Sequence, residues 1–160
     1  MKTTLSLLTA SVISTVSLIS MAQAEAAGEH KIVSPEEINW EAGPPALPPG
    51  AETVVLYGDP AKAGLFALRL KLPKGYHIPP HTHPKPEVVT IVSGAARLGM
   101  GEAADEKKTE SVTAGGFIAM PPGMAHFVYI DEPTVVQLNS VGPWELDYVK
   151  PADDPRKKTQ

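Results

Sequence analysis

Short apolar and alternating segments, each followed by a turn rich in glycine, proline or charge, fill most of the chain after Glu52. In residues 65–72 every second side chain is Phe or Leu, and a period of two places these side chains on one face of a strand. Further strands are expected at residues 53–57, 88–92, 95–100, 117–120, 126–130, 135–140 and 145–149. Short strands at this spacing predict an all-β sandwich or barrel.

The residues before Glu52 follow a different pattern. Ser34-Pro35-Glu36-Glu37 has the residue types of a capping box with proline at the first helical position, which predicts a short helix. Residues 43–50 (GPPALPPG) predict an extended, polyproline-like connector along the surface. Residues 102–110 (EAADEKKTE) are expected to form a solvated loop.

The N-terminal residues have the features of a secretory signal peptide. Lys2 is followed by an apolar run that contains several Ser and Thr residues, and Ala22-Gln23-Ala24 has the small-x-small pattern of a cleavage site. The alternative, a membrane anchor, needs roughly 20 apolar residues to span a bilayer, and this run is shorter and more polar. We therefore expect cleavage after Ala24 and a periplasmic or secreted protein.

This interpretation divides the chain into a signal peptide (1–24), an N-terminal arm with a short helix and a Pro-rich connector (25–50), a barrel (51–150) and a polar C-terminal tail (151–160).

Composition limits the partners and the ligands. The chain has 14 Lys and Arg against 18 Asp and Glu, a net charge of −4, and no basic stripe. Neither nucleic acid nor, after signal cleavage, a membrane is an expected partner. The chain contains no cysteine, so a metal site must be built from histidines and carboxylates.

Such residues cluster in the segment HTHPKPEVVTIVSG, residues 81–94. His81, His83 and Glu87 share odd parity, which on an extended chain places them on one face at the start of a strand. The two prolines between them have the other parity, and proline is tolerated at strand starts and edges. A fourth ligand is expected from elsewhere, and His126, which follows the turn Pro121-Pro122-Gly123, is the candidate.

These residues carry a resemblance to the cupin superfamily. The first cupin motif is matched at Gly75, His81, His83, Glu87 and Gly94, and the second at Gly115, Pro121, Gly123 and His126. Ile130 stands where the second motif usually ends in asparagine; that asparagine is not a metal ligand in the family, so the resemblance still implies metal binding.

The resemblance implies a six-stranded jelly-roll barrel with a metal at its mouth. It also implies that His81, His83, Glu87 and His126 bind the metal. Three imidazoles and one carboxylate suit divalent copper, zinc, nickel, manganese or iron and leave positions open for a small molecule.

Three functions remain open for a barrel of this kind. The first is a metal-dependent enzyme, such as a dioxygenase-like oxidoreductase acting on a small molecule, with Glu87 as a proton acceptor. The second is a non-catalytic module that binds or senses a metal or ligand, since the chain is also similar to small exported single-cupin proteins and to cupin domains of anti-sigma regulators. The third is a metal-free structural barrel, which would leave all four candidate ligands without a role.

Other residues have two interpretations each. His30 and His77 are expected to be structural, although His77 could orient a ligand. Gln137 and Asn139 share a strand face and either orient ligands or point into solvent.

Three apolar residues are placed near the pocket or the barrel end. Met124 is the methionine expected nearest the pocket, and Phe66 is a candidate for its wall. Trp144 is expected to seal the barrel end or to form an oligomer contact, so a homodimer stays open.

Overall fold

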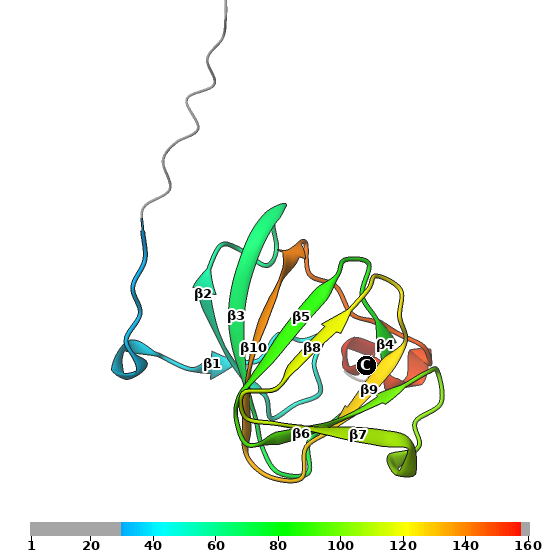
Figure 1. Cartoon of the computed structure of the whole chain (residues 1–160). Helices are drawn as coiled ribbons and strands as arrows, with labels where there is room; N and C mark the ends of the chain where they lie inside the picture. The colour runs from blue at the N-terminus through cyan, green and yellow to red at the C-terminus, as the bar shows by residue number, and fades with distance from the viewer. Residues whose placement is uncertain (1–29, 158–160) are drawn as a thin grey trace, which may run out of the picture. The chain divides into compact units, whose positions relative to one another are not determined.

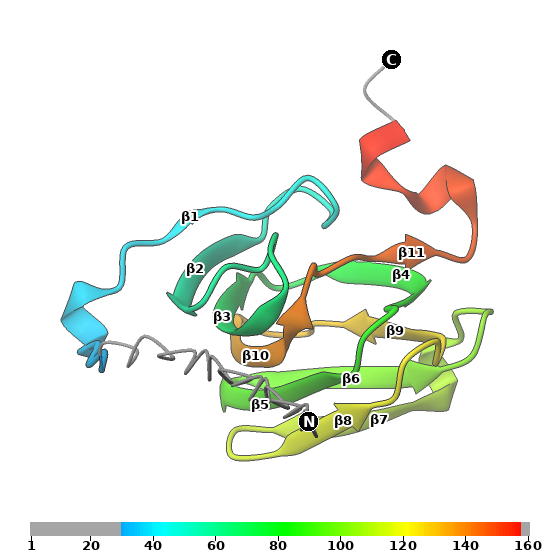
Figure 2. The ribbon, with the colours of Figure 1, turned by 90° about the horizontal axis from the view of Figure 1, so that it is seen from above.

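The computed structural model describes residues 30–157 of the 160-residue chain, and the predicted signal peptide lies outside them. Two antiparallel sheets face each other (Figure 1 and Figure 2). The six-stranded sheet has the order β1 (Glu41–Ala42), β2 (Glu52–Tyr57), β3 (Gly64–Leu72), β10 (Thr134–Gly142), β5 (Glu87–Ser93) and β8 (Phe117–Met120). The five-stranded sheet has the order β11 (Asp147–Tyr148), β4 (His77–Thr82), β9 (His126–Tyr129), β6 (Ala95–Met100) and β7 (Thr109–Thr113). The all-β jelly-roll prediction is therefore confirmed.

Helical structure within residues 30–157 consists of four single 3₁₀ turns. These are η1 (Pro35–Glu37), η2 (Glu106–Lys108), η3 (Pro151–Asp153) and η4 (Pro155–Lys157). The predicted N-terminal helix is thus one turn long, and the Glu37 carboxylate accepts the Ser34 backbone N–H at 2.7 Å as a capping box requires. In this part of the chain no helix has the length and apolarity needed to span a bilayer.

The core lies between the two sheets because buried and more exposed side chains alternate along each long strand. In β3 and β10 the register pairs Leu68 with Leu138 and Leu70 with Val136, and all four side chains are buried. Burying one such side chain contributes about 1.5–3 kcal/mol to folding. The intervening residues of both strands point out of the barrel.

A bulge in β4 places its two histidines, His77 and His81, on opposite faces of the sheet. Ile78 pairs with Val128 of β9, whereas His81 pairs with His126, so β4 uses one residue more than β9 between these points. The extra residue falls in Pro79-Pro80, where proline is tolerated because a bulge leaves a residue outside the hydrogen-bond ladder. His77 and His81 have the same parity in sequence but lie on opposite faces of the sheet.

The chain then changes sheet between the first two candidate ligands and the third. His81 lies in β4 of one sheet, and Glu87 begins β5 of the other. The expectation that His81, His83 and Glu87 share one face of one strand is therefore wrong. The residues between β4 and β5 include Pro84 and Pro86, which interrupt the strand and let the chain cross.

The Pro-rich connector contributes to the core, contrary to the expectation of a surface segment. Leu47 is buried in the main apolar cluster. Tyr76 donates its hydroxyl hydrogen to the Pro48 carbonyl, and Tyr148 donates to the Ala46 carbonyl at 2.7 Å. These two bonds hold the connector against the barrel.

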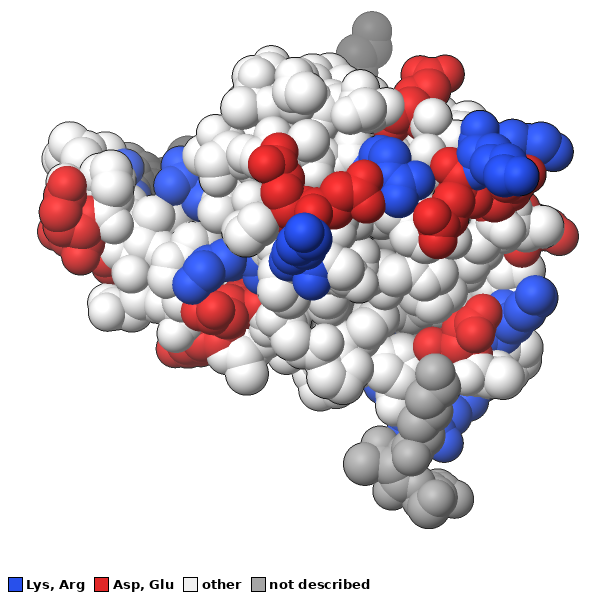
Figure 3. All heavy atoms as spheres, turned by 90° about the horizontal axis from the view of Figure 1, so that it is seen from below, with Lys and Arg blue, Asp and Glu red and all other residues white. Residues whose placement is uncertain are grey.

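The molecular surface in Figure 3 shows acidic and basic side chains next to one another on the face in view. Among the ion pairs of the described residues, Arg97 pairs with Asp131 and lies 3.6 Å from Glu106.

Candidate metal centre

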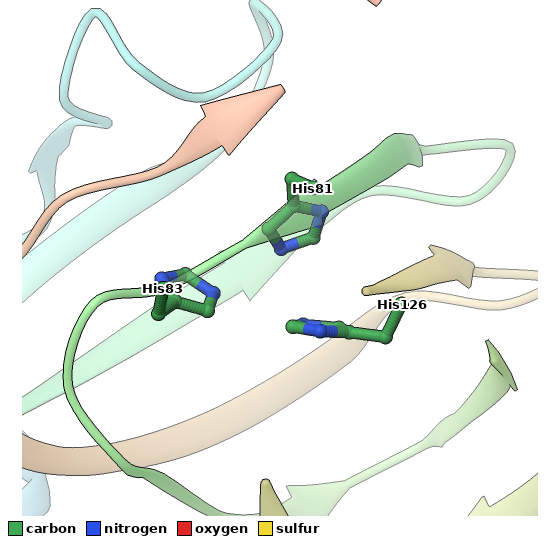
Figure 4. A group of neighbouring side chains, drawn as sticks. All are labelled: His81, His83 and His126. Atoms are coloured by element: carbon green, nitrogen blue, oxygen red, sulfur yellow. The ribbon is translucent and has the colours of Figure 1, made fainter. Parts of the chain in front are cut away.

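Three imidazoles from two neighbouring strands converge inside the barrel. His81 lies in β4, His83 directly follows that strand, and His126 begins β9 (Figure 4). One nitrogen from each ring lies within 4.8 Å of the others. The three side chains are almost fully buried, with exposed fractions of 2%, 5% and 1%.

Each ring is oriented by a backbone carbonyl on its outer nitrogen. Nδ1 of His81 faces the Pro79 oxygen at 2.8 Å, and Nδ1 of His126 faces the Met124 oxygen at 3.0 Å. Nδ1 of His83 faces the Glu145 oxygen at 2.7 Å. Because a carbonyl oxygen can only accept, Nδ1 must carry the hydrogen, and Nε2 keeps its lone pair. This is the arrangement that metal-binding histidines use.

Burial keeps the three imidazoles neutral. It lowers the pKa of His81 well below its ordinary value, and the neighbouring His126 and His83 lower it further. Burial also lowers the pKa of His83 and of His126. A neutral imidazole has a lone pair to share, so the electrostatics of the site favour metal binding over protonation.

Glu87, the fourth predicted ligand, lies beside two of the three rings. Its Oε1 is 3.4 Å from His83 Nε2, and its Oε2 is 4.0 Å from His126 Nε2. The three residues whose ligand atoms all lie within 4.8 Å of one another are His81, His83 and His126, and Glu87 is not part of that group. Burial raises the pKa of Glu87, while His126 and a hydrogen bond from Trp144 act in the opposite direction.

The residues present fit a divalent cation. His83 Nε2 is buried without a hydrogen-bond partner in the described part of the chain. With its hydrogen on Nδ1, its lone pair faces a carboxylate oxygen 3.4 Å away. Two electron pairs directed at each other in a buried site repel, and a shared cation removes the repulsion.

These groups line an apolar cavity of about 60 Å³ between the sheets. Apart from the three imidazoles and Glu87, its described lining consists of aliphatic side chains together with Met120 and Trp144. Leu47 of the connector forms part of the wall. The cavity therefore combines a polar group of nitrogen and oxygen ligands with surroundings that exclude water.

Backbone contacts join the two sequence motifs. The Gly123 N–H, from the turn before β9, donates to the His83 carbonyl at 2.8 Å. Gly123 has a φ of 75°, a conformation that favours glycine. This turn thus sets the distance between His83 and His126, which explains why a glycine is needed there.

Several residues lie elsewhere than the sequence suggested. Met124 is 41% exposed, and Met120 is the methionine that lines the cavity. Phe66 is fully buried and is not among the described residues that line the cavity; its ring centroid lies 6.4 Å from that of Trp144. For Gln137, where two alternatives were open, the outward one holds, and its side chain accepts a hydrogen bond from Arg69 at 3.1 Å.

Sequence reasoning missed the role of Trp144 at the site. Its indole N–H donates to Glu87 Oε1 at 3.1 Å, and its ring lies nearly parallel to that of His83. The residue follows β10, far in sequence from both motifs. Its position after Gly142-Pro143 suggested the end of a strand but gave no indication of its partner.

Comparison with known proteins agrees with this architecture. The cupin family model matches residues 59–139, a range that includes both motifs and all four candidate ligands. The chain therefore belongs to the cupin family.

The curated relatives are longer proteins from rice, Oryza sativa subsp. japonica. Germin-like protein 1-1 is 34% identical over 65 residues, which are 40% of this chain and 30% of that protein. Germin-like protein 9-3 is 36% identical over 52 residues, 32% of this chain and 24% of that protein. The similarity thus spans less than a third of these relatives.

Solved structures with low sequence identity share the fold. A candidate acetylacetone dioxygenase from Methylibium petroleiphilum superposes with a TM-score of 0.62 at 18% identity, over 82% of this chain and 88% of that one. The polyketide cyclase RemF from Streptomyces resistomycificus gives a TM-score of 0.62 at 19% identity, over 82% and 94%. At these identities the likeness concerns the fold alone.

Proposed function

We propose that this chain is a metal-dependent oxidoreductase of dioxygenase type that acts on a small, mainly apolar molecule. The observation that carries the proposal is the convergence of three neutral, carbonyl-oriented imidazoles and one carboxylate on an apolar cavity of about 60 Å³. His81, His83 and His126 would hold the metal, with Glu87 as the fourth ligand or as a nearby base.

When bound, copper, iron, manganese or nickel would supply Lewis acidity and redox chemistry toward dioxygen. The protein's own contribution is positional. The three carbonyl acceptors keep each Nε2 directed inward, and the aliphatic walls exclude water and strengthen electrostatic interactions. Glu87 is the group placed to accept a proton from a bound molecule, because it lies beside the histidines and burial raises its pKa above the ordinary value.

The cavity also suggests the substrate class. Its described walls offer apolar side chains, so a substrate with many polar groups would leave them without hydrogen-bond partners. A compact molecule with one or two oxygen atoms, directed at the histidines, fits better. One structural neighbour is described as a candidate acetylacetone dioxygenase, and acetylacetone is a molecule of this kind. That neighbour shares only the fold with this chain.

The test is oxygen uptake by protein loaded separately with iron, manganese, copper and nickel. A panel of small diketones, catechols and thiols would be compared with polar dicarboxylates and sugars. We expect uptake with a member of the apolar group and loss of uptake in His126→Ala. Uptake with none of the compounds, for any of the metals, would contradict the oxidoreductase proposal.

A second function, non-catalytic binding of a metal or a metal-bound ligand, is favoured by one specific observation. Among the described residues that line the cavity, Glu87 and the three imidazoles are the titratable groups, so no separate acid–base pair accompanies them. Stoichiometric metal binding without turnover would support this second function.

We also propose that the protein works outside the cytoplasm, based on the signal-peptide features of residues 1–24. Mass spectrometry of protein recovered from its native compartment should show a chain that begins at Glu25. A mature chain that retains Lys2 would contradict export by cleavage.

A further inference from the structure

We propose that Trp144 is the positioning residue of the candidate metal centre and acts through the Glu87 carboxylate. The inference rests on the proposed metal-binding function and extends it to a residue outside both sequence motifs. Three contacts carry it, and all three lie in the short segment between β10 and β11.

The first contact fixes one oxygen of Glu87. The indole N–H of Trp144 donates to Oε1 at 3.1 Å, and Glu87 as a residue is only 5% exposed. Indole nitrogen is a donor with no acceptor capacity, and a charged carboxylate oxygen is a stronger acceptor than a neutral ring nitrogen. The same Oε1 lies 3.4 Å from His83 Nε2, and Oε2 lies 4.0 Å from His126 Nε2, so the bond to Trp144 fixes how both oxygens face the histidines.

The second and third contacts fix His83 from the same segment. The Trp144 ring lies 6.1 Å from the His83 ring, centroid to centroid, with 8° between the planes. The next residue, Glu145, accepts the Nδ1 hydrogen of His83 at 2.7 Å through its backbone carbonyl. Residues 144 and 145 therefore determine the orientation of two candidate ligands that come from a different part of the sequence.

The consequence is a carboxylate restrained to one orientation relative to the histidines. A carboxylate free to rotate can bind a metal through both oxygens or leave it altogether, whereas one held by a hydrogen bond on Oε1 has a single orientation. Partners of this kind beside a metal site typically change metal affinity by about 10- to 100-fold. Trp144 thus controls the orientation in which the Glu87 carboxylate faces the candidate metal site, although Trp144 itself is not a metal ligand.

The experiment is a double-mutant cycle on Co²⁺ affinity, measured by competition with a chromophoric chelator on metal-stripped full-length chain. Trp144→Phe keeps an aromatic ring next to His83 and removes the N–H donor. We expect it to weaken Co²⁺ binding about 10-fold. In a Glu87→Ala background, the same substitution should change affinity less than about twofold, because its partner is gone.

The visible absorption of bound Co²⁺ gives a second measurement that a merely structural role would not change in this way. Trp144→Phe should alter the spectrum of the wild-type site, and the spectra of Glu87→Ala and the double variant should coincide. Trp40→Phe is the matched control, since Trp40 lies against Lys71. It should leave affinity and spectrum unchanged.

Equal fold-changes in both backgrounds, or no change in either, would overturn the role of Trp144 while leaving the metal site intact. Failure of the parent chain to bind Co²⁺ would overturn the proposed function as well. The near-ultraviolet circular dichroism of each metal-free variant shows whether it has folded. If Trp144→Phe does not fold, Trp144→His keeps a ring N–H at the position and should restore folding and affinity, and failure of both variants to fold would assign Trp144 to the core instead.

Discussion

His77 and His83 have similar immediate surroundings on opposite faces of the sheet. Each ring lies nearly parallel to an aromatic ring, His77 with Tyr129 (4.2 Å, 4°) and His83 with Trp144 (6.1 Å, 8°). Each also has a buried Nε2 without a hydrogen-bond partner among residues 30–157. They differ in what surrounds that nitrogen.

His83 faces two more imidazoles and a carboxylate, whereas His77 lies on the outer face of the barrel, with Arg97 packed over its neighbour Tyr129. An unpaired ring nitrogen beside an aromatic ring is therefore not sufficient to indicate a metal ligand. What distinguishes His83 is the convergence of several lone pairs, and the bulge at Pro79-Pro80 is what places His81 with it and leaves His77 outside.

The largest expected effect separates these two histidines by metal affinity. His83→Ala removes a candidate ligand and should weaken Zn²⁺ binding by ~100-fold or more. This loss exceeds the one usually caused by removing a residue that only hydrogen-bonds to a ligand. His77→Ala should bind Zn²⁺ as the parent chain does. Elemental analysis and chelator competition measure both. Equal losses in the two variants would remove the distinction, and an unfolded His83→Ala would indicate a core histidine.

A second prediction uses stability in place of affinity. Metal that binds only the folded state at 100 times its dissociation constant stabilises it by about 2.7 kcal/mol, which for a domain of this size raises the melting temperature by roughly 10 °C. We expect this shift in the parent chain and in His77→Ala, and little or none in His83→Ala. An unchanged midpoint of the parent chain at saturating Zn²⁺ would count against the site.

The outer stack can be tested by removing its aromatic partner. Tyr129→Leu removes the ring that stacks on His77 and also contacts Phe127 and Arg97. Loss of aromatic contacts of this kind should lower the free energy of unfolding by about 1 kcal/mol. Denaturant unfolding in the presence of chelator measures it. A tenfold change in Zn²⁺ affinity would show that the outer stack reaches the metal site.

The smallest expected effect concerns pH. Burial lowers the pKa of His77 below its ordinary value of 6.5, with Asp153 and Glu106 partly opposing the shift. The unfolded chain therefore binds the proton more readily, and stability should fall as pH drops from above 6.5 toward the pKa of the folded state. His77→Gln should show a shallower decline over this range in chelator-containing buffer. Identical pH profiles would mean that His77 titrates alike in both states.

The fold was largely predictable from the sequence because it depends on patterns within short segments of the chain. Alternation in residues 65–72 and the turns between short segments were sufficient to predict an all-β barrel, and β3 and β10 follow that pattern. The strand β4 was not predicted, since Pro79-Pro80 interrupts its pattern. The start of β7 at Thr109 fell within the expected charged loop.

The candidate site was predictable in its residues but not in its geometry. Motif spacing grouped His81, His83 and His126, and the structure brings them together. The change of sheet between His83 and Glu87, and the contact from Trp144, depend on pairings between distant segments. Residue spacing along one chain contains no information about such pairings.

The connector that carries Leu47 has a consequence for the rate at which its backbone amides exchange hydrogen with solvent. The Leu47 N–H donates to the Pro44 carbonyl at 2.9 Å, and the Gly43 N–H donates to the Ala51 carbonyl at 2.8 Å. Both amides belong to a segment whose sequence alone suggests rapid exchange. Because Leu47 forms part of the cavity wall and its segment is bonded to Tyr76 and Tyr148, we expect both amides to exchange more slowly than the sequence suggests. Slow hydrogen exchange at both amides would show that the connector stays packed against the barrel.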